Sequence, residues 1–228
     1  MFWYDWTYIL VIPGLLLGLW AQMRVKSAFA KYSKVRTRNG RPASEVVADM
    51  LDKNRNGAVR VEQTTGTLTD HYDPKTETLR LSQDVYSSNS VAALGVAAHE
   101  AGHAMQKFDD YPLLTFRTAI VPVVNIGSSL AWPIFLLGLI FSWEPLEYAG
   151  IILFSLVLVF TLVTLPVEIN ASKRALTMLT DGGYISGDEI SGVKSVLSAA
   201  ALTYVASVVS AALQLLRLVL LSRQNDRR

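Results

Sequence analysis

The residues with the clearest chemical potential are those of segment 99–103, which reads HEAGH. On a helix, side chains four positions apart lie on the same face, so His99 and His103 can present two imidazole nitrogens to one metal ion. Glu100 stands beside the first of these ligands, where its carboxylate can act as a general base on a water molecule. The HExxH spacing therefore predicts a catalytic zinc site that activates water, as in a metallopeptidase.

Three features favour a metal site over a surface helix that carries these residues by chance. The chain has only three histidines, and two of them lie in this segment. The preceding residues 91–98 are apolar and small, which predicts a buried helix on which unpaired His and Glu side chains would be costly. Gly102 and the alanines around it would also allow another backbone to approach this helix closely.

A catalytic zinc site needs a third protein ligand and one open position. The chain has no cysteine, and Asp109 stands where the third histidine of an extended motif would be. Among the carboxylates, Glu168 is the strongest candidate for the third ligand. It follows an apolar run that brings the chain back to the side of the membrane on which His99 and His103 lie. The alternative is a glutamate that is favoured at a helix start by the helix dipole.

His71 is the remaining histidine, and it allows three interpretations. It could be a catalytic residue that donates a hydrogen bond to the oxyanion formed during hydrolysis, or it could be a metal ligand. It could also be a hairpin residue bonded to Asp70 or Asp73. Three other residues compete for the oxyanion role: Tyr72, Arg174 and Tyr184.

The composition indicates a membrane protein. Hydrophobic residues make up 51% of the 228 residues, charged residues make up 18%, and the mean hydropathy is +0.30. Apolar runs at 118–143 and 148–167 predict a transmembrane hairpin, and a shorter run at 6–23 predicts a transmembrane helix before it. The run 196–221 could span the membrane or lie buried or in the interface, since Arg217 would fall inside the span.

The placement of basic residues predicts the orientation. Residues 24–41 are rich in Lys and Arg, whereas the loop 144–147 has none. The positive-inside rule then puts the first of these segments and the HExxH segment in the cytoplasm. We therefore expect a multi-pass protein of the cell membrane with its catalytic site on the cytoplasmic side. The net charge of +2 gives no reason to expect a nucleic-acid partner.

The expected fold class is a mainly α membrane protein, in which a zincin-like catalytic domain with a small β-hairpin or sheet accompanies three to four transmembrane helices. A strand is expected at 59–63, a hairpin at 68–73 and 78–82, and the motif helix from about Ser90 to Phe108. The expected domain organisation is a transmembrane anchor (6–23), a cytoplasmic zincin-like part (42–117), a transmembrane hairpin (118–167), and the third-ligand helix with the C-terminal apolar helix (168–222).

The sequence resembles the YugP-type family of bacterial membrane zinc metallopeptidases over essentially the whole chain. The resemblance rests on four segments: LTDHYDP at 68–74, LRLS at 79–82, AAHEAGHAMQ at 97–106 and LPVEINAS at 165–172. The combination is far more specific than the HExxH spacing alone.

The layout is similar, more distantly, to the HtpX and CAAX-prenyl endopeptidase family. In that family a transmembrane hairpin separates HExxH from a glutamate ligand, and this likeness implies that Glu168 is the third ligand. The chain departs from the pattern at Ser172, where the family has an acidic residue. This departure puts a ligand-orienting role for Ser172 in question and makes Asn170 the alternative.

The main hypothesis is a membrane-embedded metalloendopeptidase that hydrolyses peptide bonds of membrane or membrane-proximal proteins. Zn²⁺ is its expected cofactor, and a polypeptide substrate and the lipid bilayer are its expected partners. The substrate would pair as an added strand with the hairpin edge at 68–73. Two alternatives are a non-enzymatic adaptor with a structural, four-ligand metal site, and a membrane chaperone or scaffold without metal. The oligomeric state is open.

Overall fold

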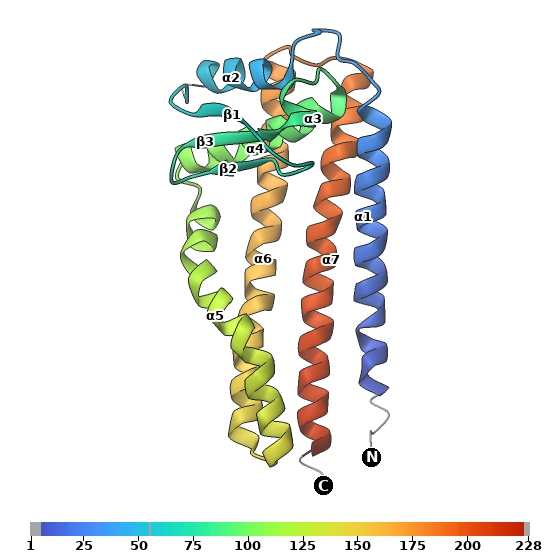
Figure 1. The fold of residues 1–228 in the computed structure, drawn as a ribbon, viewed down its shortest axis with the longest axis vertical. Coiled ribbons are helices and arrows are strands. Elements are labelled where there is room, and N and C mark those ends of the chain that lie inside the picture. The colour runs from blue at the N-terminus through green and yellow to red at the C-terminus, as the bar shows by residue number, and fades with distance from the viewer. Residues whose placement is uncertain (1–5, 55, 226–228) are drawn as a thin grey trace. The chain divides into compact units, whose positions relative to one another are not determined.

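The computed structural model describes residues 6–54 and 56–225 (Figure 1). Helices dominate it, and a three-stranded sheet accompanies them. The elements in chain order are the 3-10 helix Trp6–Leu10, α1 Ile12–Tyr32, α2 Ala43–Lys53, β1 Arg60–Thr64, β2 His71–Asp73, β3 Thr78–Ser82, α3 Gln83–Tyr86, α4 Val91–Phe108, α5 Pro112–Phe141, α6 Glu144–Asp181 and α7 Asp188–Asn225. The predicted mainly α membrane fold with a small sheet is confirmed.

Among the residues that the structure describes, four helical segments are long and apolar enough to cross a membrane. They are Trp6–Tyr32, Pro112–Phe141, Glu144–Asp181 and Asp188–Asn225. The number matches the upper end of the predicted range, and the run 196–221, whose role the sequence left open, belongs to the fourth segment. By length and composition this run is a candidate span like the other three.

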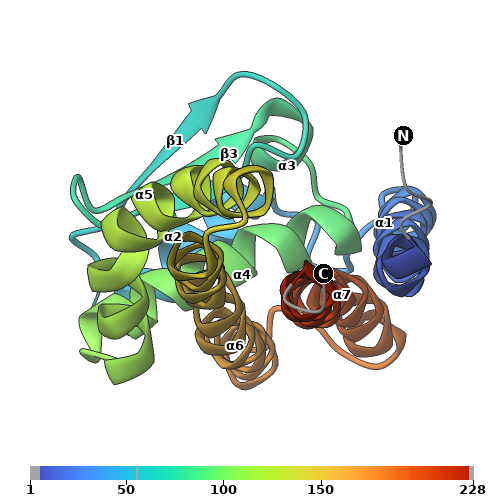
Figure 2. The same cartoon turned by 90° about the horizontal axis from the view of Figure 1, so that it is seen from below.

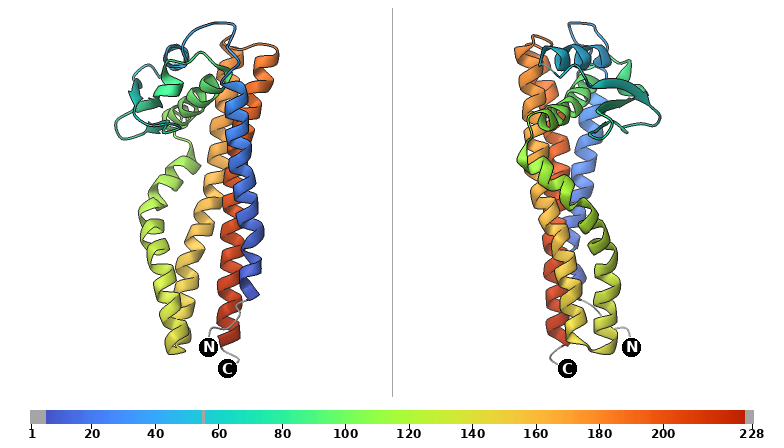
Figure 3. Two further views of the ribbon diagram at one scale, coloured as in Figure 1. Left: turned by 45° about the vertical axis from the view of Figure 1, so that its right-hand side comes forward. Right: turned by 90° about the vertical axis from the view of Figure 1, so that its left-hand side faces the viewer.

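The described residues form two compact units. The first consists of the described parts of 1–21, 116–166 and 203–228, and the second consists of 22–115 and 167–202. In the first unit α5 and α6 form an antiparallel helical hairpin (Figure 3). Gly150 makes this possible, since a Cβ there would lie 2.6 Å from the Cβ of Phe135. Small residues at such crossings let membrane helices approach closely.

Arg217 lies in the apolar run of α7, and neighbouring side chains offset the cost of burying its charge. Its guanidinium group lies 3.7 Å from the centroid of the Tyr8 ring, and its Nε donates to the hydroxyl of Thr7 at 3.2 Å. The centroid of the Trp132 ring lies 5.5 Å from the same guanidinium group. Cation–π contacts and a hydrogen bond reduce the cost of burying a charge. Within this unit the beginning of α1 lies beside α7 (Figures 1 and 2), since a Cβ on Gly14 would lie 2.8 Å from Oγ of Ser210.

The sheet belongs to the second unit and has the strand order β1-β3-β2. The predicted hairpin is present, because β2 pairs antiparallel with β3, but its first arm covers 71–73 rather than the predicted 68–73. Leu68 has a positive φ of 55°, which an extended strand does not allow. Strand β1 pairs in parallel with the other side of β3. The side chains of Leu79 and Leu81 on the central strand are fully buried in a core shared with α2 and α4, including Met50, Leu51 and Leu94.

Helix α4 begins and ends where the sequence predicts. The side chain of Ser90 accepts a hydrogen bond from the backbone N–H of Ala93 at 3.2 Å, which satisfies one of the free donors of the first turn. The helix ends at Phe108, and Asp110 beyond it has a positive φ of 49°. Most of the helix is buried, and it lies beside the sheet (Figure 1).

Candidate metal centre

The site is built where α4 and α6 approach each other. Both segments belong to the second unit, which contains all of α4 and the part of α6 from Val167 onward. At the crossing, a Cβ on Gly102 would collide with the carbonyl oxygen of Ala171 and lie 3.0 Å from its carbonyl carbon. Only glycine lets the two backbones come this close. The sequence-based expectation of a close approach at Gly102 thus has a structural counterpart.

Gly102→Ala is expected to separate the two helices and to weaken metal binding. Backbone atoms cannot rotate away as a side chain can, so the added methyl group must be relieved by a shift of α6. Overpacking of this kind costs about 1–3 kcal/mol of folding free energy. The check is a parallel measurement of thermal unfolding and zinc content, with Gly18→Ala as control, because a Cβ at Gly18 meets nothing within 4 Å. Unchanged zinc content in Gly102→Ala would contradict this explanation of the glycine.

Three of the predicted site residues converge at this crossing. The Nε2 atoms of His99 and His103 lie 3.1 and 3.3 Å from the Oε2 atom of Glu168, and the three ligand atoms lie within 4.8 Å of one another. The side chain of Glu168 is 3% exposed, whereas those of the two histidines are 14% and 13% exposed. The group could therefore hold a metal ion, and its two histidines are partly accessible to solvent. The roles of these residues as ligands stay predictions.

Gln106 favours one tautomer of the neutral His103 ring. Its Nε2 donates both to the carbonyl oxygen of Val167 at 2.8 Å and to Oδ1 of Asn170 at 2.9 Å. Its Oε1 is therefore an acceptor, and it lies 2.9 Å from Nδ1 of His103. This pattern puts the imidazole proton on Nδ1 and leaves the Nε2 lone pair toward the metal position, as metal-binding histidines require.

Ser172 makes the corresponding contact with the other histidine. Its Oγ lies 3.1 Å from Nδ1 of His99, which leaves the Nε2 atom of that ring toward Glu168. The sequence put this role of Ser172 in question and offered Asn170 instead. The structure shows that Ser172 touches a candidate ligand directly, whereas Asn170 touches Gln106 and, at 2.9 Å, Nε of Arg174.

Glu100, the candidate general base, lies outside the three-residue group. Its Oε2 accepts the backbone N–H of Tyr72 at 3.0 Å, so the edge strand β2 holds the carboxylate in place. Burial raises the pKa of Glu100 above its usual range. The neighbouring His99 and His103 act against this rise, and the carboxylates of Glu168 and Asp70 add to it. A general base works best when its pKa approaches the pH at which it operates.

The structure does not bring His71 into this group. Its side chain is exposed on β2, and its Nδ1 lies 2.8 Å from the carbonyl oxygen of Thr69. The metal-ligand group found among the described residues does not include it. This arrangement favours the hairpin role, although the bonded partner is neither of the two expected aspartates. Its catalytic role stays a prediction that this contact does not support.

The three rivals for the oxyanion role have separate surroundings. The hydroxyl of Tyr184 donates to Asp49 at 2.7 Å, and Arg174 forms an ion pair with Asp109 and bonds Asn170. Tyr72 approaches the site through its backbone N–H. Gln106 is the residue that sequence reasoning missed. Its signal was its place three positions after His103, on the same helix face.

The donor set fits zinc chemically. Two imidazole nitrogens and one carboxylate oxygen are a common catalytic ligand set, in which a fourth position stays open. A structural site would usually be closed by four protein ligands. The group found in the described residues supplies three.

Comparison with known proteins gives two matches. A family model described as "Putative neutral zinc metallopeptidase" matches residues 7–223. A protein named "Putative membrane protease YugP" from Bacillus subtilis (strain 168) is 48% identical over 212 residues, which cover 93% of this chain and 94% of that protein. No solved structure matches. The predicted resemblance to the YugP-type family is confirmed.

Proposed function

The chain belongs to the family described as "Putative neutral zinc metallopeptidase", and on that premise we propose that it is a membrane-embedded zinc metalloendopeptidase. The observation that carries the proposal is the convergence of His99, His103 and Glu168 at the α4–α6 crossing, with Glu100 on the same helix as the two histidines. These residues combine three ligands of a zinc-type donor set with a carboxylate that can accept a proton.

His99, His103 and Glu168 would hold the zinc ion. Zinc bound to such a set acts as a Lewis acid that polarises a peptide carbonyl and lowers the pKa of a water molecule to about 7. Glu100 accepts the proton of the attacking water and later donates it to the leaving amine. Gln106 and Ser172 keep both imidazoles in the orientation that points Nε2 at the metal position.

The substrate is proposed to be a polypeptide in extended conformation that pairs with the edge strand β2. In the described part of the chain β2 pairs with β3 only, so no strand is paired with its other edge. That edge faces the candidate base, because the N–H of Tyr72 points at Glu100. A substrate carbonyl that accepts this N–H would replace the Glu100 carboxylate as its acceptor and would lie beside the general base. Strand addition of this kind fixes a peptide by its backbone rather than by its side chains.

A multi-pass topology with the site on the cytoplasmic side is part of the proposal. Four candidate spans support several passes. The basic residues of 24–41 and the absence of Lys and Arg from 144–147 support the orientation. Substrates would then be membrane proteins or proteins close to the cytoplasmic membrane surface.

Removal of the metal is expected to abolish hydrolysis reversibly. The full-length protein in detergent should contain one zinc ion per chain and should degrade an unstructured model protein. A chelator such as 1,10-phenanthroline should stop the reaction, and added Zn²⁺ should restore it, because the ligands release and rebind the ion. Both zinc content and hydrolysis are measured on the same sample.

The outcomes separate the alternatives. Zinc without hydrolysis of any protein substrate would support a non-enzymatic adaptor with a metal site. The absence of bound zinc at neutral pH would support a scaffold without metal. Either result overturns the proposed peptidase.

A further inference from the structure

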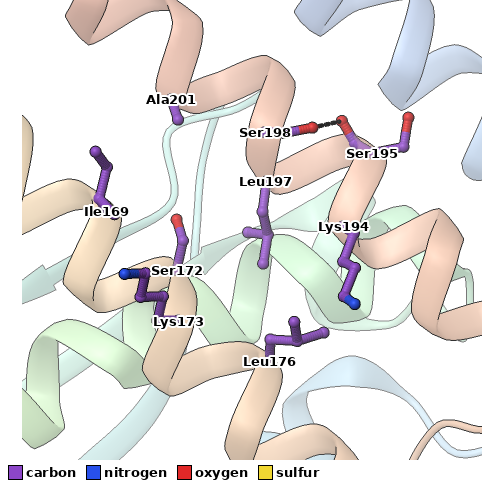
Figure 4. A pocket seen from close by; sticks show the side chains of 9 residues that line it. All are labelled: Ile169, Ser172, Lys173, Leu176, Lys194, Ser195, Leu197, Ser198 and Ala201. Atoms are coloured by element: carbon purple, nitrogen blue, oxygen red, sulfur yellow. Dashed lines mark hydrogen bonds between the residues drawn. The ribbon is translucent and has the colours of Figure 1, made fainter.

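A cavity of about 410 Å³ lies between α6 and α7, in the same compact unit as the metal centre. Figure 4 shows the side chains that line it. Leu176 and Leu197 form its apolar floor, while Lys173 and Lys194 stand on opposite sides. None of the lining residues is acidic. The cavity therefore combines an apolar surface with two positive charges.

The two lysines carry charges that the protein does not compensate. Both side chains are exposed, and no ion pair or hydrogen bond links either of them to another residue in the described parts of the chain. The hydroxyl of Ser195, also in the lining, likewise has no hydrogen-bond partner among the described residues, whereas Ser198 donates to the backbone carbonyl of Ser195 at 3.2 Å. An occupant that offers an anion and oxygen acceptors would satisfy these groups.

The position of the lysines in the sequence indicates an occupant from the membrane. Lys173 lies six residues beyond Val167, where the apolar run of α6 ends, and Lys194 lies two residues before Val196, where the apolar run of α7 begins. Both are therefore at the polar ends of candidate spans, the level at which lysine side chains meet lipid headgroups. Ile169, on the α6 side, extends the cavity lining toward the apolar run.

We propose that this cavity binds one anionic phospholipid, whose phosphate lies between Lys173 and Lys194 and whose apolar part covers Leu176, Leu197 and Ile169. An acidic peptide would use the charges but would leave the apolar floor and its continuation toward the spans without a partner. The proposal does not depend on peptidase activity. Ser172 lines the cavity and contacts His99, so the lipid would lie one side chain away from the candidate metal centre.

The test is a lipid competition on the full-length protein in detergent. The protein is equilibrated with equal amounts of dioleoyl phosphatidylglycerol and dioleoyl phosphatidylcholine, and retained lipids are counted by native mass spectrometry. Wild type is expected to retain one phosphatidylglycerol with a preference of about 25-fold, since each of the two lysines near an anionic headgroup contributes roughly fivefold. Lys173→Gln with Lys194→Gln should remove this preference.

Two further variants distinguish a built site from general attraction to basic residues. Lys75→Gln with Lys107→Gln removes the same charge from exposed lysines outside the cavity and should keep the preference. Ser198→Trp fills the cavity but keeps both charges, and it should lose the bound lipid. Ser198→Trp also tests the proposal if the double lysine variant fails to fold.

Four outcomes would overturn the proposal. Three of them are equal retention of both lipids by wild type, an equal loss of preference in the control double variant, and full retention by Ser198→Trp. Inorganic phosphate at millimolar concentration should not displace the lipid. Displacement by phosphate would mean that the lysines bind a free anion instead, and it would also overturn the proposal.

Discussion

Glu100→Gln is expected to lower the rate of peptide hydrolysis by about 10²–10⁴-fold, the usual contribution of a positioned general base, and to leave the zinc content unchanged. Glutamine has the shape of glutamate but cannot accept the proton of the attacking water. Its Oε1 can still accept the N–H of Tyr72, so the contact between α4 and the edge strand should survive. Glu100 is not a member of the three-residue ligand group.

The measurement compares hydrolysis and zinc content of purified wild type, Glu100→Gln and a matched control. Glu77→Gln serves as control because it makes the same change at an exposed position of the β2–β3 turn region. Control and wild type should be equally active. If Glu100→Gln degrades the substrate as fast as wild type, the proposed mechanism fails. If it loses zinc, Glu100 has a ligand or structural role instead.

The elements that position this site could be predicted because their signals are local. The Ser90 cap and the apolar residues after it determine where α4 begins, and the observed bounds of Val91–Phe108 agree with the prediction. The long apolar runs predict membrane helices by length alone. The parallel pairing of β1 with β3 carries no such signal, because it joins strands that are separated by the hairpin.

The contacts that orient the candidate ligands could not be predicted from the sequence pattern. Reasoning by family pattern favoured Asn170 once an acidic residue was missing at position 172. Helix geometry gives the observed answer, since Ser172 lies four positions after Glu168 and thus on its face of α6. Asn170 lies on a different face and touches Gln106 of α4. The distance between two helices from distant parts of the chain depends on packing, which no local pattern reveals.

For His71 the sequence suggested a site role that the structure does not support. The scarcity of histidine in the chain made it a candidate by elimination, although elimination says nothing of where a side chain lies. The neighbouring Tyr72 makes the contact with Glu100 through its backbone N–H, which any residue except proline could supply. A contact made by the backbone cannot be predicted from the type of the residue that makes it.

Glu168→Ala is expected to reduce zinc affinity by more than about 100-fold, because replacing even an outer partner of a metal ligand typically costs 10–100-fold. The change leaves two histidines and no carboxylate at the metal position. Hydrolysis should be lost together with zinc, in contrast to Glu100→Gln, which should lose hydrolysis alone. This contrast separates a ligand from a base on one pair of samples.

Thermal unfolding with and without zinc distinguishes a ligand role of Glu168 from a merely structural one. A structural role would leave the zinc-dependent increase in unfolding temperature unchanged. A ligand that binds only the folded state stabilises it in proportion to the logarithm of its concentration over Kd. Wild type and the control Glu77→Gln should therefore unfold at a higher temperature when Zn²⁺ is added, and Glu168→Ala should not. If Glu168→Ala is destabilised in the absence of zinc yet keeps the full zinc-dependent increase, Glu168 is a packing partner of the two histidines. The third ligand would then have to come from another residue.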